Sequence, residues 1–201
     1  MPYSLYWTLR ACVLGRRVRL RDTARNSYPS GGTEDVEWIS CMKAAIKETA
    51  GPEKGQKGHV AGHLWNILFI DDSEDDRVLF GIAVRQADAP GLRFLRALSG
   101  GSEAIKYLEG MGAFSDRDKY PYPDLMVLDL KMPRTTGFDV LTWMKQQLSQ
   151  AKRPRVVVVS DSRMKADVEK AFGLGADAYL QKPEGLPELV DLIRGLEKRL
   201  S

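Results

Sequence analysis

Cysteine and histidine are scarce in this chain of 201 residues. The two cysteines, Cys12 and Cys41, and the two histidines, His59 and His63, do not stand at the spacings of metal ligands. A Cys/His zinc site and a disulfide framework are therefore excluded as the basis of the fold. So little cysteine suits a reducing compartment, and we expect a cytoplasmic protein.

Long apolar runs are also missing. A membrane-spanning helix needs about 18 or more consecutive apolar residues, and the most apolar opening segment, residues 3–14, is interrupted by Arg10. We therefore expect no insertion into a membrane. The chain is 43% hydrophobic and 28% charged, which is enough apolar content for one buried core.

The formal net charge of +3 is unevenly distributed. Residues 1–64 contain ten Lys/Arg and six Asp/Glu, so the remainder is slightly acidic. Much of this part is rich in Gly, Ser, Pro and Lys, as linkers are. We predict a flexible basic extension and linker over residues 1–64 and a folded domain over residues 65–201. An arm for nucleic acid or a membrane surface, a transit-peptide-like leader and a stretch upstream of a true start at Met42 stay open as alternatives for residues 1–64.

From Trp65 onward, short apolar runs alternate with longer amphipathic segments. Three runs are continuously apolar, at residues 67–70, 125–128 and 156–159, which predicts strands buried on both faces. Weaker strands are expected at residues 92–97 and 176–180.

Apolar residues at spacings of three and four between and after these runs predict five helices. Their expected core residues are Val78, Leu79 and Ile82; Ala104, Ile105 and Leu108; Leu141, Met144 and Leu148; Met164, Val168, Ala171 and Phe172; and Leu186, Leu189, Val190, Ile193 and Leu196. The pattern predicts an α/β fold, a doubly wound parallel sheet of five strands with five helices.

Polar residues follow the strands at the points where the strands end. Asp71-Asp72 follow the first strand, Asp129 the third, Ser160 the fourth, and Lys182 comes shortly after the last. Ligands of an open parallel sheet bind beyond the carboxyl ends of its strands. We therefore expect these five residues to converge on one crevice.

Three carboxylates brought together must either hold a proton at a raised pKa or recruit a cation. Mg²⁺ prefers oxygen ligands and commonly takes one or two carboxylates together with phosphate oxygens. A carboxylate that faces Mg²⁺, a lysine and a hydroxyl is equipped for phosphoryl transfer. Asp129 is the predicted nucleophile.

Four motifs carry a resemblance to a known family. They are Asp71-Asp72 after the first strand, the segment at residues 123–133 around Asp129 with Gly137 behind it, the strand that ends at Ser160, and the segment at residues 176–183 with Tyr179, Lys182 and Pro183. In their order and spacing, residues 65–201 resemble the receiver domain of two-component response regulators.

The resemblance implies a flavodoxin-like fold with strand order 2-1-3-4-5. It also implies a metal site in which Mg²⁺ is bound by Asp72, Asp129 and the backbone carbonyl of Lys131, while Asp71 acts mainly through water. Asp129 is the implied phosphoacceptor.

The remaining site residues have implied roles in switching. Ser160 would hydrogen-bond a phosphoryl oxygen on Asp129, and Lys182 would pair with another. The movement of Ser160 would let Tyr179 turn inward and change the surface that a partner contacts.

The implied partners are a sensor histidine kinase or phosphotransfer protein as the phosphoryl donor, and a downstream protein target. The domain itself is expected to bind neither nucleic acid nor membrane, and homodimer formation is compatible with the resemblance. We expect no enzyme activity beyond its own phosphorylation and dephosphorylation. Only 19 residues follow Lys182, which predicts a stand-alone receiver without an output domain.

Two departures from the family pattern bear on competing functions. Lys131 stands where phosphatases of the haloacid dehalogenase type carry a second aspartate, which disfavours that enzyme class. Asp161 stands where the receiver family usually has a small residue, which keeps open a receiver-like interaction module that works without phosphorylation. A dinucleotide-binding fold is disfavoured because the first strand leads into Asp71-Asp72 rather than a glycine-rich turn.

Overall fold

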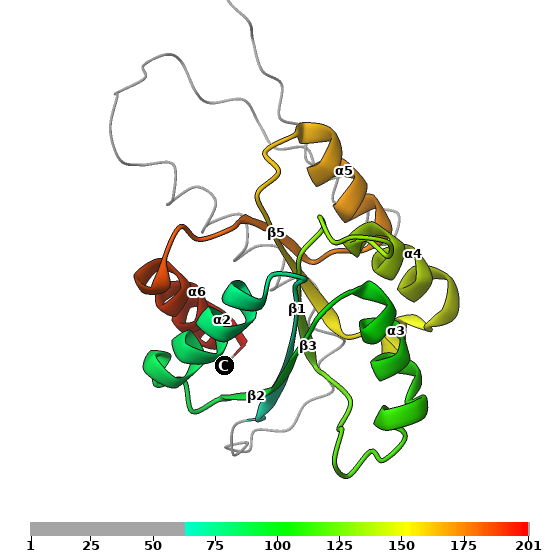
Figure 1. The fold of residues 1–201 in the computed structure, drawn as a ribbon, viewed down its shortest axis with the longest axis horizontal. Helices are drawn as coiled ribbons and strands as arrows, with labels where there is room; N and C mark the ends of the chain where they lie inside the picture. The colour runs from blue at the N-terminus through cyan, green and yellow to red at the C-terminus, as the bar shows by residue number, and fades with distance from the viewer. Residues whose placement is uncertain (1–62, 201) are drawn as a thin grey trace, which may run out of the picture. The chain divides into compact units, whose positions relative to one another are not determined.

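The computed structural model describes residues 63–200. The extension predicted at residues 1–64 therefore lies, apart from its last two residues, outside the described residues. The described chain forms one sheet with the order β2-β1-β3-β4-β5, in which all neighbours are parallel (Figure 1). Its strands are β1 (Trp65–Ile70), β2 (Leu92–Leu98), β3 (Leu125–Leu128), β4 (Arg155–Ser160) and β5 (Ala178–Gln181). The predicted strand order is confirmed.

Five helices cover the sheet on both faces. They are α2 (Glu74–Ala87), α3 (Gly101–Glu109), α4 (Gly137–Gln147), α5 (Lys165–Leu174) and α6 (Leu186–Leu200), with short 3-10 turns at Gly112–Phe114 and Gln150–Lys152. Helices α2 and α6 pack on one face, and α3, α4 and α5 on the other (Figure 1). Within residues 63–200, no helix is both long and apolar enough to cross a membrane.

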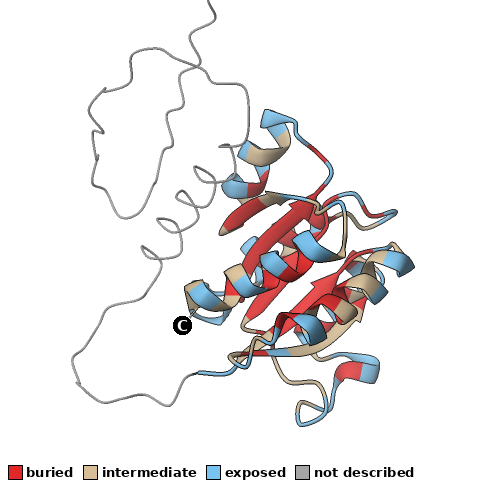
Figure 2. Ribbon diagram, turned by 90° about the vertical axis from the view of Figure 1, so that its left-hand side faces the viewer, coloured by how far each residue is buried: buried red, intermediate tan, exposed pale blue. Residues whose placement is uncertain are grey.

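Alternate residues of each strand point into two separate cores. In β1, Leu68 and Ile70 pack in the core under α3, α4 and α5. Ile67 and Phe69 pack in the core under α2 and α6. Because both faces are covered, β3 is buried along its whole length, and Figure 2 shows the strands as the buried centre of the domain. The continuous apolar runs in the sequence are explained by this double burial.

Polar caps start the helices that follow the acidic strand ends. Ser73 caps α2, and its side chain accepts a hydrogen bond from the backbone N–H of Asp76. Thr136 and Asp139 form a reciprocal capping box at the start of α4. These caps fix the points at which the loops after β1 and β3 end and the helices begin.

Three of the predicted core residues are wrong. Val78 is 57% exposed, Met164 65% and Phe172 40%. The buried side of α2 runs through Phe80, Ala83 and Ala87, and Val78 lies two residues, or about 200°, away from Phe80 around the helix. In α5 the buried residue is Ala171, so Phe172 turns away by about 100°, and Met164 is the N-cap residue.

Gly137 gives a test of how tightly the loop after β3 is packed. A Cβ atom added to Gly137 would lie 2.2 Å from the backbone oxygen of Asp129 and 2.8 Å from Cα of Leu130. We expect Gly137→Ala to lower the free energy of unfolding by about 2–3 kcal/mol, because this backbone cannot move without displacing Asp129. Gly173→Ala is the matched control: an added Cβ there meets nothing within 4 Å, so the substitution should stabilise α5 by about 0.5–1 kcal/mol. Urea unfolding of both variants measures this, and equal effects would contradict the close approach at Gly137.

Candidate functional site

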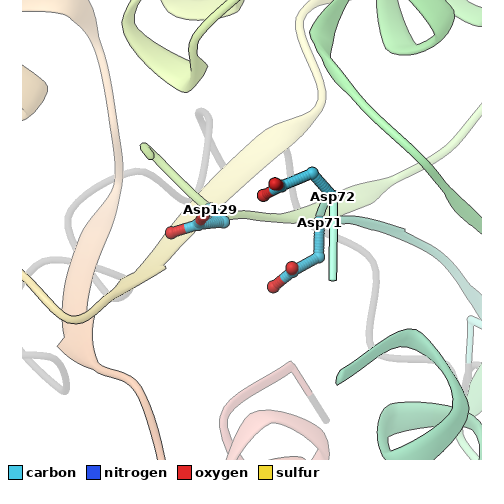
Figure 3. Close-up of side chains that lie close together, drawn as sticks. All are labelled: Asp71, Asp72 and Asp129. Carbon is cyan, nitrogen blue, oxygen red and sulfur yellow. The ribbon is translucent and has the colours of Figure 1, made fainter. Parts of the chain in front are cut away.

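Three carboxylates meet at the carboxyl ends of two neighbouring strands. Asp71 and Asp72 follow β1, Asp129 follows β3, and β1 pairs directly with β3. One oxygen from each carboxylate lies within 4.8 Å of the other two. Figure 3 shows the three side chains lying close together where β1 and β3 end. The predicted convergence of these acids is confirmed.

Backbone hydrogen bonds hold the two buried acids in place. The N–H of Asp71 donates to the carbonyl oxygen of Leu98 in β2 at 3.1 Å, and the N–H of Asp129 donates to that of Ile70 in β1 at 2.9 Å. The Oδ1 atom of Asp71 also accepts from the N–H of Ser73 at 2.9 Å. Each acid therefore extends the sheet by one residue, and its carboxylate has little freedom to move away from the others.

Burial makes the negative charge at this site costly. Asp71 is 1% exposed and Asp129 4%, whereas Asp72 is exposed. Burial raises the pKa of Asp129, and the Asp71 carboxylate adds to this, while the Lys182 ammonium acts in the opposite direction. Burial likewise raises the pKa of Asp71 despite the hydrogen bonds from Lys182 and Ser73. The site therefore favours a bound proton or a cation.

Lys182 supplies a positive charge from the loop after β5. Its Nζ atom lies 2.8 Å from Oδ2 of Asp71 and 2.6 Å from Oδ2 of Asp76, and its side chain is 17% exposed. Burial lowers the pKa of the Lys182 ammonium, but hydrogen bonds to these two carboxylates outweigh it and raise the pKa above the ordinary lysine value. Lys182 is thus a charged member of the site, as the sequence predicted.

Asp76 is a site residue that the sequence did not predict. Asp76 lies in the first turn of α2, where an acid is expected to favour the helix dipole. Three acids, Glu74, Asp75 and Asp76, share that turn, and nothing in the sequence distinguishes the one that faces Lys182. Only the direction in which α2 leaves β1 brings Asp76 to the lysine.

Ser160 in β4 and Tyr179 in β5 lie on neighbouring strands. Ser160 ends β4 and is fully buried, and its carbonyl oxygen accepts from the N–H of Lys182 at 3.1 Å. Tyr179 is 5% exposed, and its hydroxyl donates to the carbonyl oxygen of Ser162 at 2.8 Å. The tyrosine that was predicted to turn inward is therefore inward in this structure.

Lys131 and Asp161 lie in the loops that follow β3 and β4. The N–H of Lys131 donates to Oδ2 of Asp129 at 3.2 Å, so the Lys131 backbone lies beside the carboxylates. Both the Lys131 and Asp161 residues are exposed. A metal ligand role for the Lys131 carbonyl stays a prediction.

The charge of Asp129 gives a test by stability and pH. A carboxyl group whose pKa is raised by folding destabilises the folded state when it is ionised, so this cost appears as the pH rises through the raised pKa. At pH 7 in a metal chelator, Asp129→Asn should raise the free energy of unfolding, because the amide carries no charge that burial would penalise. The gain should vanish as the pH falls below about 3.9, the ordinary aspartate pKa.

Denaturant unfolding at several pH values measures this gain. Asp75→Asn removes an exposed acid of α2 and should change the free energy of unfolding by less than about 0.5 kcal/mol. A less stable Asp129→Asn protein at pH 7 would show that the buried charge is not costly.

Curated relatives match the described domain over most of their own length. Response regulator Rcp1 of Synechocystis sp. is 30% identical over 131 residues, which is 65% of this chain and 85% of Rcp1. The polar-differentiation response regulator DivK of Brucella ovis is 26% identical over 129 residues, which is 64% of this chain and 93% of DivK.

Solved structures agree with these relatives. The Mn²⁺-bound form of Rcp1 superposes with a TM-score of 0.56 at 29% identity, covering 67% of this chain and 92% of that one. The phosphorylated cyanobacterial phytochrome response regulator RcpA superposes with a TM-score of 0.58 at 28% identity, covering 68% and 93%.

A family model matches the same part of the chain. Its description is response regulator receiver domain, and it covers residues 67–194, which include the three acids, Ser160, Tyr179 and Lys182. The match and the DivK relative identify a receiver and not a catalytic enzyme, so the phosphatase alternative is rejected. With this sheet order, this acidic site and these relatives, the chain belongs to the response regulator receiver domain family of two-component signal transduction.

Proposed function

We propose that this receiver accepts a phosphoryl group on Asp129 from a sensor histidine kinase or a phosphotransfer protein, and that phosphorylation changes its affinity for a downstream protein. The observation that carries the proposal is the meeting of Asp129 with Asp71 and Asp72 beside the Lys182 ammonium. Asp129 lies at the edge of the sheet in a loop that backbone hydrogen bonds hold in place. A carboxylate held in this way is already positioned for transfer before a donor arrives.

The donor set fits a hard divalent cation. Carboxylate oxygens are the ligands that Mg²⁺ prefers, and two of the three carboxylates here are buried with raised pKa values. We propose Asp72, Asp129 and the backbone carbonyl of Lys131 as ligands, with Asp71 bound through water. When bound, Mg²⁺ would neutralise charge on the carboxylates and on the phosphoryl oxygens. A solved form of the relative Rcp1 is Mn²⁺-bound, which supports a divalent ion as the cofactor of this receiver.

Asp129 is the nucleophile of the proposed transfer. One carboxylate oxygen attacks the phosphorus of a phosphorylated histidine, the O–P bond forms as the P–N bond breaks, and the electron pair of that bond leaves with the imidazole nitrogen. Lys182 and the Ser160 hydroxyl are the proposed partners of the phosphoryl oxygens. The protein contributes alignment and positive charge rather than a second covalent step.

The proposed switch links Asp129 to the surface of α5 through Ser160 and Tyr179. The Tyr179 hydroxyl is bonded to the Ser162 backbone, and Met164, which follows in the same loop, is 65% exposed. A movement of this loop toward a phosphoryl group would shift Met164 and the start of α5. We propose that a downstream protein detects this surface.

One of these similar structures suggests which kinase to test as the phosphoryl donor. RcpA is a phytochrome response regulator, so a phytochrome-type histidine kinase is the first donor to test. We propose a cytoplasmic protein in which residues 65–201 act as the receiver and residues 1–64 as an extension. Self-association into a homodimer belongs to the same proposal.

A second candidate is an interaction module that works without phosphorylation. The buried position of Tyr179 favours it. If the Tyr179 side chain is buried both before and after phosphorylation, phosphorylation cannot act by turning this side chain inward. The exposed acid Asp161 beside the site favours it as well, because its charge repels an incoming phosphoryl group.

Incubation with acetyl phosphate and Mg²⁺ separates the two candidates. We expect intact mass to increase by one phosphoryl group and peptide mapping to place it on Asp129. Chelation of Mg²⁺ or the substitution Asp129→Asn should abolish the modification, because each removes a part that the transfer requires. A parent protein that stays unmodified under these conditions would contradict phosphorylation and leave the interaction module.

Lys131 and Asp161 should affect different steps of the phosphorylation cycle. The exposed ammonium of Lys131 can screen the phosphoryl group from water, so Lys131→Ala should speed its loss from Asp129. The Asp161 carboxylate adds negative charge near the donor, so Asp161→Ala should speed loading. Phosphorylation and decay rates with one donor measure both effects. Rates within about twofold of the parent, equal to about 0.4 kcal/mol in barrier height, would show that neither side chain reaches the phosphoryl group.

A further inference from the structure

The ammonium group of Lys182 is held between two carboxylates of different kinds. Its Nζ atom lies 2.8 Å from Oδ2 of Asp71 and 2.6 Å from Oδ2 of Asp76. Asp71 is buried and belongs to the group of three acids, whereas Asp76 lies on α2 with 35% of its side chain exposed. Within residues 63–200, the ion pairs of Lys182 go to these two acids and not to Asp129.

Asp76 is fixed on the side of Lys182 by its place in the helix. Its backbone N–H donates to the Oγ atom of Ser73, the N-cap residue of α2. The next residue, Arg77, donates from Nη1 to the backbone oxygens of Asp71 and Asp72, at 2.7 Å in each case. The first turn of α2 is thereby tied to the loop that carries the acids, which keeps the backbone of Asp76 beside the lysine.

Asp71 and Asp76 would respond differently to a cation bound at the three acids. A divalent cation bound among Asp71, Asp72 and Asp129 would offset the charge of Asp71. Asp76 lies outside this group, so its charge would continue to attract Lys182. A phosphoryl group on Asp129 must then compete with the Asp76 carboxylate for the same ammonium.

We propose that Asp76 is a positioning residue that restrains Lys182 and thereby slows the phosphorylation of Asp129. The inference rests on the proposed function, since it concerns the lysine that would pair with the phosphoryl group. Asp76 itself touches no reacting atom. Its carboxylate sets how readily the Lys182 ammonium is released toward Asp129.

Three variants of the full chain test the proposal. Asp76→Asn removes the competing charge and should make phosphorylation by acetyl phosphate with Mg²⁺ about threefold faster, the size expected for one partly exposed ion pair. Asp76→Glu retains the charge and should return the rate toward that of the parent. Asp75→Asn is the matched control, because it removes an equal charge from the same exposed turn of α2 and should change the rate by less than about 1.5-fold.

A second measurement follows Lys182 directly and does not require phosphorylation. Each protein is treated with a limiting amount of an amine-acylating reagent, and the extent of modification at Lys182 is read by peptide mapping. Loss of the Asp76 carboxylate should raise the acylation of Lys182 about threefold, while Asp75→Asn should leave it unchanged. A purely structural role of Asp76 in capping α2 would not single out this lysine.

The outcomes separate the inference from the function on which it rests. Faster phosphorylation and higher Lys182 acylation in Asp76→Asn alone would support it. A parent that is phosphorylated on Asp129 at the same rate as Asp76→Asn, or equal Lys182 acylation in the Asp75 and Asp76 variants, would overturn the restraint while leaving the phosphoacceptor in place. A parent that is not phosphorylated at all would overturn both.

Discussion

The structure depends on one electrostatic constraint, the burial of two carboxylates at the end of a parallel sheet. Asp71 and Asp129 are almost entirely removed from solvent, and an isolated buried charge is strongly unfavourable. The protein meets this cost in part with the Lys182 ammonium and with backbone N–H groups that point at the carboxylates. The compensation is incomplete, because burial still raises the pKa values of both acids. A site in this condition is suited to bind a cation.

The sheet makes this arrangement rigid. Both faces of the sheet are covered by helices, and the central strand β3 is buried along its whole length, so the strands cannot slide without exposing apolar side chains. The residue after β1 and the residue after β3 each continue the hydrogen-bond ladder toward the neighbouring strand. Gly137 lets the start of α4 approach the backbone of Asp129 more closely than a Cβ atom would allow. Stability of the core and precision of the site therefore have the same origin.

Lys182 connects the acidic site to strands β4 and β5. Its side chain pairs with Asp71 and Asp76 on one side, while its backbone N–H is bonded to Ser160 at the end of β4. Tyr179 lies three residues before Lys182 on β5, and its hydroxyl donates a hydrogen bond to the backbone of Ser162 in the loop after Ser160. A change in the charge around Asp129 thus has a short covalent and hydrogen-bonded route to the loop before α5. The switch proposed above would use this route.

The sequence pattern by itself determined the strand positions and the residues at the strand ends, whereas the strand order followed from the resemblance to receiver domains. It could do so because burial on both faces leaves continuous apolar runs, and because the polar residues that interrupt them are those that face the ligand-binding edge. It failed on helix faces: Val78, Met164 and Phe172 are apolar and exposed, and helical spacing alone does not tell a core residue from one on the surface of α2 or α5.

Only the tertiary structure decided which charges pair. Glu74, Asp75 and Asp76 are equivalent in the sequence, and the angle at which α2 leaves β1 selects Asp76 as the partner of Lys182, 106 residues further along the chain. The inward position of Tyr179, with its hydroxyl hydrogen-bonded to the Ser162 carbonyl oxygen of another loop, is likewise seen only in the tertiary structure. Strand positions are local properties of the chain and can be read from its pattern. Ion pairs between distant segments depend on distances of a few ångströms, which only the packed structure defines.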